Sequence, residues 1–389
     1  MNGARQLRTV AALGLVLLIW IFDRHYRFFD MVIYHDAIRW WRNGGELYDY
    51  LAPVRGELGF TYPPFAAFVL APVSTVPAVT AGWLNAAGSV LALTCVLAVL
   101  SAPIADRHGW SRSSVVAVAL PLALCTEPIR QTLGFGQVNL WLFALVVADL
   151  TGLRHRRWAG AGVGLAAAIK LTPALFIVYL LVTRQWRTAR TAALTAAALT
   201  GCGFLLAPAE SARYFGDLLW QTDRVGVASA VTNQSLSGLL ARLAGTATAP
   251  TFWWLTLALL MLVIGMHRAG QAHRAGDEVT ALTLVGLTAN LISPMSWTHH
   301  LVFLPVAVLI LADRALRRRD LIAAVAASLV YVLSVVSPIW FSPAPLPRST
   351  FTLMLIVLVV ALPWRARGPV PQDAGNGRLL APGGVASGG

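Results

Sequence analysis

The chain has 389 residues, of which 57% are hydrophobic and only 12% charged, with a formal net charge of +13. Soluble domains average about 25% charged residues, so this composition excludes an ordinary soluble protein and indicates a polytopic membrane protein. The basic excess does not indicate nucleic-acid binding, because the arginines form short clusters between apolar runs. Cys95, Cys125 and Cys202 lie within apolar runs, which argues against a disulfide framework and against a thiolate metal site.

An all-α fold with about twelve transmembrane helices is predicted from the apolar runs, allowing for broken helices. The first run, residues 9–22, lacks a small-residue cleavage site and is predicted to be a retained span. Residues 64–79 are predicted to be re-entrant or interfacial. The remaining predicted spans are residues 80–103, 113–127, 137–153, 158–170, 172–184, 188–208, 251–267, 277–296, 299–313, 321–340 and 350–364.

The arginine clusters set the predicted orientation. With both termini in the cytoplasm, the clusters fall on the cytoplasmic side, as the positive-inside rule requires. Merging 158–184 into one span would invert the later clusters, so a helix break is predicted at Lys170 to Pro173. Residues 1–367 are then one transmembrane domain, and residues 368–389, rich in Gly, Pro and Ala, are predicted to be a disordered cytoplasmic tail.

The unusual polar motifs fall on the predicted outer side, as expected of an enzyme acting at one membrane face. The first outer loop holds Asp36 beside His35, in a segment apolar enough to form an interfacial amphipathic helix. A carboxylate can take the proton of an attacking sugar hydroxyl, so Asp36 is a candidate general base. The alternative is a solvated acid or a salt bridge to Arg39.

Two cations are candidates for holding a phosphate. Lys170 is the only lysine in the chain and lies at the predicted helix break, where its ammonium can bind a lipid-linked phosphate. The alternative is a lysine that snorkels near a helix end. Arg130 is the second candidate, and its alternative is a surface ion pair with Glu127.

His299 and His300 stand at the predicted start of a helix, after a Ser-Pro pair. Adjacent histidines point in different directions on a helix and the H-E-x-x-H spacing is absent, so no metal site is predicted. One imidazole is a candidate for orienting Asp36 or the leaving phosphate. The alternative is an interfacial belt of histidine and tryptophan.

The order of these motifs resembles the polyprenyl-phosphate-dependent membrane glycosyltransferases of the C superfamily, in particular glycosyltransferase family 87. The matching features are Asp36 in the first outer loop, Phe60-Thr61-Tyr62-Pro63-Pro64-Phe65, Gly136-Gln137-Val138-Asn139, Lys170-Leu171-Thr172-Pro173, Asn233-Gln234-Ser235-Leu236 and Ser293-Pro294-Met295-Ser296-Trp297-Thr298-His299-His300. Substrate-binding candidates on these motifs, beside Lys170 and Arg130, are Tyr62, Gln137, Asn139, Asn233 and Trp297.

The resemblance implies an inverting single displacement at an outward-facing cavity of a multi-pass cell-membrane protein. A sugar, most often mannose, would pass from a polyprenyl-phosphate donor to a hydroxyl of a glycolipid or cell-envelope glycan. Asp36 would be the general base, with His299 or His300 assisting. Neither a metal nor a cofactor is expected, and the expected partners are the donor, the glycolipid acceptor and membrane lipids, with no nucleic acid. A secondary transporter or lipid flippase is the alternative function.

Overall fold

The computed structural model describes residues 26–53 and 58–365. The predicted first span, residues 9–22, and the predicted tail, residues 368–389, lie outside the described residues. Within the described ranges the chain is helical and contains two isolated β-bridges but no β-strand. The predicted all-α class is therefore confirmed for this part of the chain.

The helices differ widely in length, from seven to 31 residues. In chain order they are α2 (Phe29–Arg42), α3 (Pro64–Leu70), α4 (Ala78–His108), α5 (Arg112–Cys125), α6 (Glu127–Phe135), α7 (Asn139–Val147), α8 (Ala161–Ile169), α9 (Leu175–Val182), α10 (Trp186–Leu206), α11 (Pro208–Gly216), α12 (Leu236–Ala244), α13 (Thr251–Arg274), α14 (Glu278–Ile292), α15 (Leu304–Arg318), α16 (Leu321–Val336) and α17 (Thr350–Ala361).

Three of the described helices, α4, α10 and α13, are long and apolar enough to cross a membrane. The pair α5 and α6 passes the same test together but bends by 75° at Thr126. The outer faces of α10 and α16 expose large apolar side chains such as Leu205, at 84%, and Ile322, at 82%. Such exposure suits a lipid surrounding, and the protein is a membrane protein. The count of about twelve spans stays a prediction, as does the interfacial position of α2.

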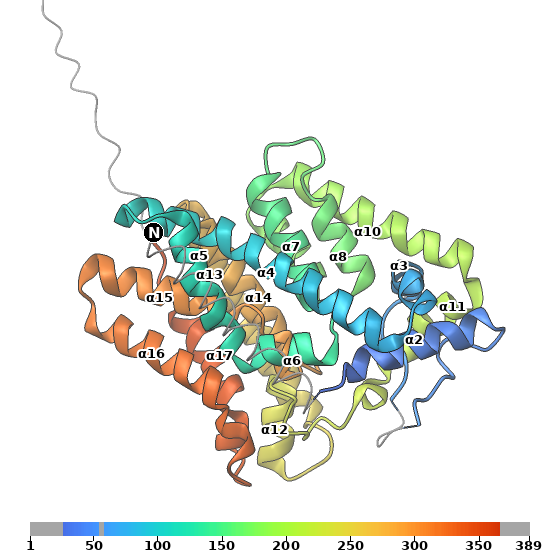
Figure 1. Cartoon of the computed structure of the whole chain (residues 1–389). Helices are drawn as coiled ribbons and strands as arrows, with labels where there is room; N and C mark the ends of the chain where they lie inside the picture. The colour runs from blue at the N-terminus through green and yellow to red at the C-terminus, as the bar shows by residue number, and fades with distance from the viewer. Residues whose placement is uncertain (1–25, 54–57, 366–389) are drawn as a thin grey trace, which may run out of the picture.

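In Figure 1, α4 runs diagonally across the molecule, with α7, α8 and α10 above it and α15, α16 and α17 below. The polar motifs gather at one end, where α2, α6, α11 and α12 lie. The loop between α7 and α8 stands at the opposite end. The long helices thus lie between the end that holds the polar motifs and the end that holds the loop between α7 and α8.

The helix break predicted at Lys170 is present. Lys170 has extended backbone angles, φ −147° and ψ 132°, and ends α8. A 3₁₀ turn at Thr172–Ala174 follows, with Pro173 in its first turn, before α9 begins. Since Pro173 has no backbone N–H and disfavours a helical residue before it, the chain cannot continue α8 through this point.

Small residues let α10 pack closely along α8. A Cβ added to Gly164 would lie 2.4 Å from the Ala192 carbonyl oxygen of α10, so no larger residue fits without a backbone shift. A Cβ added to Gly201, further along α10, would have no neighbouring atom within 4 Å. The two glycines therefore offer a matched comparison.

We expect Gly164→Ala to lower the free energy of unfolding by about 1–3 kcal/mol, because the methyl group overpacks the α8–α10 contact. Gly201→Ala should instead raise it by up to about 1 kcal/mol, because alanine is the better helix former and meets open space. Thermal unfolding in detergent, followed by tryptophan fluorescence, measures both. Equal unfolding midpoints for the two variants would contradict the close packing.

Candidate active site

A cavity of about 610 Å³ opens at the polar end of the molecule. Its wall is built by α2, the strand-like stretch before α3, α6, the break after α8, and the segment between α14 and α15. This size suits a sizeable organic ligand. The polar side chains that line it include Asp30, Tyr34, Tyr62, Gln131, Gln137, Lys170, Arg224, Trp297, His299 and His300.

Asp30, in the first turn of α2, is the carboxylate that the structure places in this cavity. Its oxygen accepts a hydrogen bond of 2.5 Å from the Gln137 side-chain amide. Burial raises the pKa of Asp30 to about 6, although the Gln137 hydrogen bond and the charge of Lys170 act in the opposite direction. A carboxylate with a pKa close to neutrality is suited to accept a proton.

Gln137 connects Asp30 to two tyrosines. Its amide nitrogen donates to the Tyr34 hydroxyl at 3.0 Å, and its amide oxygen accepts from the Tyr62 hydroxyl at 2.6 Å. Tyr34 in turn donates to the Tyr62 hydroxyl at 3.0 Å. The amide is placed by Gly136, which ends α6 at φ +74°, a conformation that side-chain-bearing residues rarely adopt. The network fixes the Asp30 carboxylate within the wall of the cavity, since Tyr34, Tyr62 and Gln137 line it as well.

Lys170 brings a positive charge into the same cavity. Its ammonium donates to the Asn139 side-chain oxygen at 2.9 Å and lies 3.0 Å from His300 Nε2. Because an ammonium has donors only, His300 Nε2 is the acceptor and its proton is assigned to Nδ1. The ammonium also stands over the Tyr62 ring at 5.3 Å. All of these partners are neutral, and no ion pair to Lys170 occurs among the described residues.

His299 lines the cavity with both ring nitrogens lacking a hydrogen-bond partner among the described residues. Its ring packs edge-on against Phe135 at 5.5 Å. Its backbone oxygen accepts from Thr132 at 2.7 Å and from Asn139 at 2.9 Å. The backbone of the segment is thus fixed to α6 and α7, while both imidazole nitrogens are buried without a hydrogen-bond partner among the described residues.

Trp297 reaches the cavity from a loop that Asn233 holds in place. The Asn233 side chain accepts from the Ser296 backbone N–H at 2.9 Å and donates to the Ala228 carbonyl at 2.9 Å. Asn233 itself is fully buried and does not line the cavity. Of these two predicted substrate-binding residues, the structure brings Trp297 to the cavity and gives Asn233 a supporting position.

Asp36 does not line this cavity. Its carboxylate lies 2.6 Å from His35 Nδ1, and His35 Nε2 is 2.9 Å from the Val76 carbonyl oxygen. Six residues along an α-helix correspond to a rotation of about 240°, so Asp36 and Asp30 lie on different faces of α2. The ion pair to Arg39 considered for Asp36 does not form, since its partner is His35.

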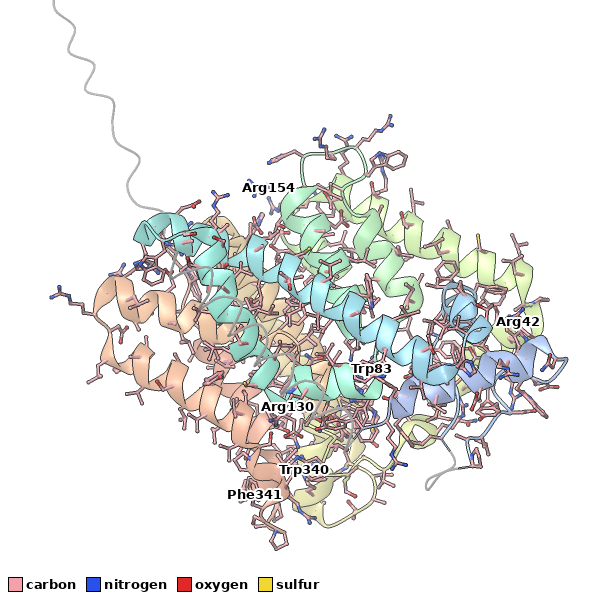
Figure 2. All side chains as sticks on the ribbon, in the orientation of Figure 1. Arg42, Trp83, Arg130, Arg154, Trp340 and Phe341 are labelled. Atoms are coloured by element: carbon pink, nitrogen blue, oxygen red, sulfur yellow. The ribbon has the colours of Figure 1, made fainter. Side chains whose placement is uncertain are left out.

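Arg130 is likewise absent from the cavity lining. Its guanidinium donates to the Val335 carbonyl of α16 at 3.2 Å and lies 4.0 Å from Glu127. Figure 2 shows Arg130 on α6, on the side of Trp340, which lies in the 3₁₀ turn after α16. The structure therefore brings together Tyr62, Gln137, Lys170, Trp297 and both histidines, with Asn139 as a direct partner of Lys170.

Asp30, Tyr34, Gln131 and Arg224 line the cavity but are absent from the sequence-based candidates. One signal in the sequence points to the first two. Asp30 and Tyr34 are four residues apart, so the acid and the aromatic residue lie on the same face of the helix. No comparable local pattern marks Gln131 or Arg224, because long-range packing brings them to the cavity. Within residues 26–53 and 58–365, no three His, Cys, Asp or Glu side chains cluster closely enough to hold a metal ion.

Two known mannosyltransferases resemble this chain over most of its length, and an arabinofuranosyltransferase resembles about half of it. A polyprenol-phosphate-mannose-dependent alpha-(1-2)-phosphatidylinositol mannoside mannosyltransferase of Mycobacterium tuberculosis is 32% identical, over 86% of this chain and 82% of its own. A phosphatidylinositol pentamannoside mannosyltransferase of Mycolicibacterium smegmatis is 32% identical, over 77% and 73%. An alpha-(1->3)-arabinofuranosyltransferase of Corynebacterium glutamicum is 30% identical, over 47% and 43%.

No solved structure matches the chain significantly. The model of glycosyltransferase family 87 matches residues 60–294, which include Tyr62, Gln137 and Lys170. The match covers more than half of the chain, and the resemblance seen in the sequence motifs is confirmed. The chain belongs to glycosyltransferase family 87.

Proposed function

We propose that this glycosyltransferase moves mannose from a polyprenol-phosphate donor to a hydroxyl of a phosphatidylinositol mannoside. The observation that carries the proposal is a carboxylate, Asp30, and an ammonium without a carboxylate partner, Lys170, lining one cavity. The names of the two mannosyltransferase relatives support the donor and the acceptor class. Family membership favours this enzyme over a transporter or flippase.

In the proposed reaction, the acceptor hydroxyl oxygen attacks the anomeric carbon of the donor sugar. Its proton passes to the Asp30 carboxylate, and the bond from the anomeric carbon to the phosphate oxygen breaks with its electron pair on oxygen. Lys170 stabilises the charge that gathers on the leaving phosphate. Attack opposite the leaving group inverts the anomeric configuration. The base role predicted for Asp36 is thus proposed for Asp30.

Gln137 and the two tyrosines act as positioning residues. They hold Asp30 through one hydrogen bond, and its second oxygen, which has no partner among the described residues, can accept the proton of the acceptor. Trp297 offers a flat apolar face of the kind on which sugar rings stack, and His299 offers ring nitrogens to sugar hydroxyls. The apolar wall formed by Leu171, Leu175 and Ile292 suits the first isoprene units of the donor.

We place the cavity on the extracytoplasmic face of a multi-pass protein. Arg154, in the basic loop after α7, stands at the end of the molecule opposite Trp340 and Phe341 (Figure 2). Arginine-rich loops remain in the cytoplasm, and exposed aromatic residues prefer the membrane interface. Trp340 and Phe341 are 51% and 75% exposed. The cavity lies toward the aromatic end, away from the basic loop.

Asp30→Asn should lower kcat for mannosyl transfer by about 10²–10⁴-fold, the usual contribution of a general base, with little change in KM. Asp36→Asn is the matched control on the same helix and should retain most activity, because its partner is His35. The assay uses proteoliposomes with labelled polyprenol-phosphate mannose and a phosphatidylinositol mannoside. Full activity of the Asp30 variant, or an equal loss in both, would reject the assignment of the base.

The pH profile provides an independent test of Asp30. The base works only when deprotonated, so kcat/KM should rise tenfold per pH unit below about 6, the pKa of Asp30, and level off above it. The ascending limb should disappear in the residual activity of Asp30→Asn. A profile that is flat from pH 5 to 8 in the unmodified enzyme would show that another group accepts the proton.

Lys170→Gln should weaken donor binding by about 10–100-fold, since a hydrogen bond to a charged group contributes about 1.5–3 kcal/mol. Arg130→Gln is the control, because Arg130 donates to a backbone carbonyl away from the cavity. The readout is equilibrium binding of polyprenol-phosphate mannose without acceptor. If Arg130→Gln weakens donor binding and Lys170→Gln does not, the phosphate position is wrong.

A further inference from the structure

A second cavity, of about 460 Å³, lies at the other end of α4 from the candidate active site. Its wall comprises the last turns of α4, the turn after α7, the start of α14, the end of α15 and the segment after α17. The 31 residues of α4 span about 45 Å at the usual helical rise, so the two cavities are well separated. The arginines that line it are Arg107, Arg154, Arg314, Arg317, Arg318 and Arg365.

The carboxylates of this cavity are already engaged by other groups. Asp313 accepts from Arg107 at 2.8 Å and from Arg317 at 2.9 Å, and lies 3.3 Å from His108 Nε2. One buried carboxylate therefore faces two guanidinium groups and an imidazole. Its single negative charge is smaller than the combined positive charge of the two arginines that donate to it.

The other two acids of the cavity, Asp277 and Glu278, bind backbone N–H groups and neighbouring side chains. Asp277 accepts from the Thr280 backbone N–H at the start of α14 and from the Arg365 backbone N–H at 2.8 Å. Glu278 contacts His273 at 2.6 Å and Tyr179 at 2.9 Å. Neither carboxylate pairs with an arginine side chain of the cavity.

Three arginines consequently lack an acidic partner. Arg314 pairs with Asp320 at 2.7 Å, but Arg154, Arg318 and Arg365 form no ion pair with a carboxylate among residues 26–53 and 58–365. With Asp320 counted beside its partner Arg314, six guanidinium groups face four carboxylates, which leaves an excess of two positive charges. Gathering like charges around a concave surface is unfavourable unless an anion enters it.

One side of the wall is apolar and follows α4, a helix that is long enough to cross the membrane. Leu100, Pro103 and Ile104 of α4 and Ile310 of α15 lie next to the arginines. A ligand with an anionic head and an apolar body matches this combination better than a small soluble anion. On the orientation proposed above, the cavity lies at the cytoplasmic membrane surface, where anionic head groups are found.

We propose that this cavity binds the phosphate group of an anionic phospholipid of the cytoplasmic leaflet. Arg154, Arg318 and Arg365 neutralise the phosphate, and the acyl chains follow the apolar side of α4 and α15. The bound lipid joins α4, α14, α15 and the segment after α17 at one point. It is distinct from the donor and the acceptor of the transfer reaction, whose cavity lies at the opposite end of α4.

The test compares ligands on the detergent-purified full chain by native mass spectrometry titration. The anionic probe is dioctanoyl phosphatidylglycerol. Dioctanoyl phosphatidylcholine has the same acyl chains but no net charge, and glycerol 3-phosphate has the phosphate but no acyl chains. The variant is Arg154→Gln/Arg318→Gln. The control is Arg190→Gln, which removes an exposed arginine of α10 outside the cavity.

We expect saturable binding of phosphatidylglycerol that weakens about 25-fold in the double variant, at about fivefold per arginine. Arg190→Gln should bind as the unmodified protein does. Arg318→Lys, which keeps the charge, should also bind normally, and unchanged mannosyl transfer by the double variant verifies its fold. Equal binding of both lipids, or no loss in the double variant, would overturn the proposal. If glycerol 3-phosphate binds as tightly as phosphatidylglycerol, the ligand of this cavity is a soluble phosphate and not a lipid.

Discussion

The side-chain amide of Gln137 holds the candidate active site together. It donates to Asp30 and Tyr34 and accepts from Tyr62, so one residue fixes a carboxylate and two hydroxyls from different segments. An amide can do this because it carries donors and an acceptor in one plane. The turn at Gly136 orients it, and the α2 helix, the stretch before α3 and the α6–α7 corner are thereby placed relative to one another.

Positive charge without a directly bonded carboxylate is the second constraint on this protein. Lys170 is held by Asn139 and His300, which stabilise the ammonium through hydrogen bonds without neutralising it. Keeping such a charge away from water is costly, so a site of this kind is poised for an anionic ligand. The same principle applies at the other end of α4, where Arg154 and Arg318 face a cavity whose carboxylates are engaged by other groups.

The helix break at Lys170 shows how a membrane fold can position chemistry. α8 and α9 are each shorter than a usual transmembrane helix, and the break between them brings a lysine into a cavity lined by other segments. Gly164 permits the close contact of α8 with α10 that supports this arrangement. Irregular backbone is tolerated here because it is enclosed by protein and faces a polar cavity.

The sequence by itself determined the membrane class, the helical fold, the break at Pro173 and the family, because composition, hydrophobic runs and ordered motifs are local properties of the chain. It also singled out Lys170, Gln137 and His300, each within a motif. It did not distinguish Asp30 from Asp36. Both acids lie on one helix, and only the packing of α2 against its neighbours decides which helix face meets the cavity. The arginine cavity at the far end of α4 also required the tertiary structure, because the sequence showed the basic clusters but not which carboxylates were already engaged.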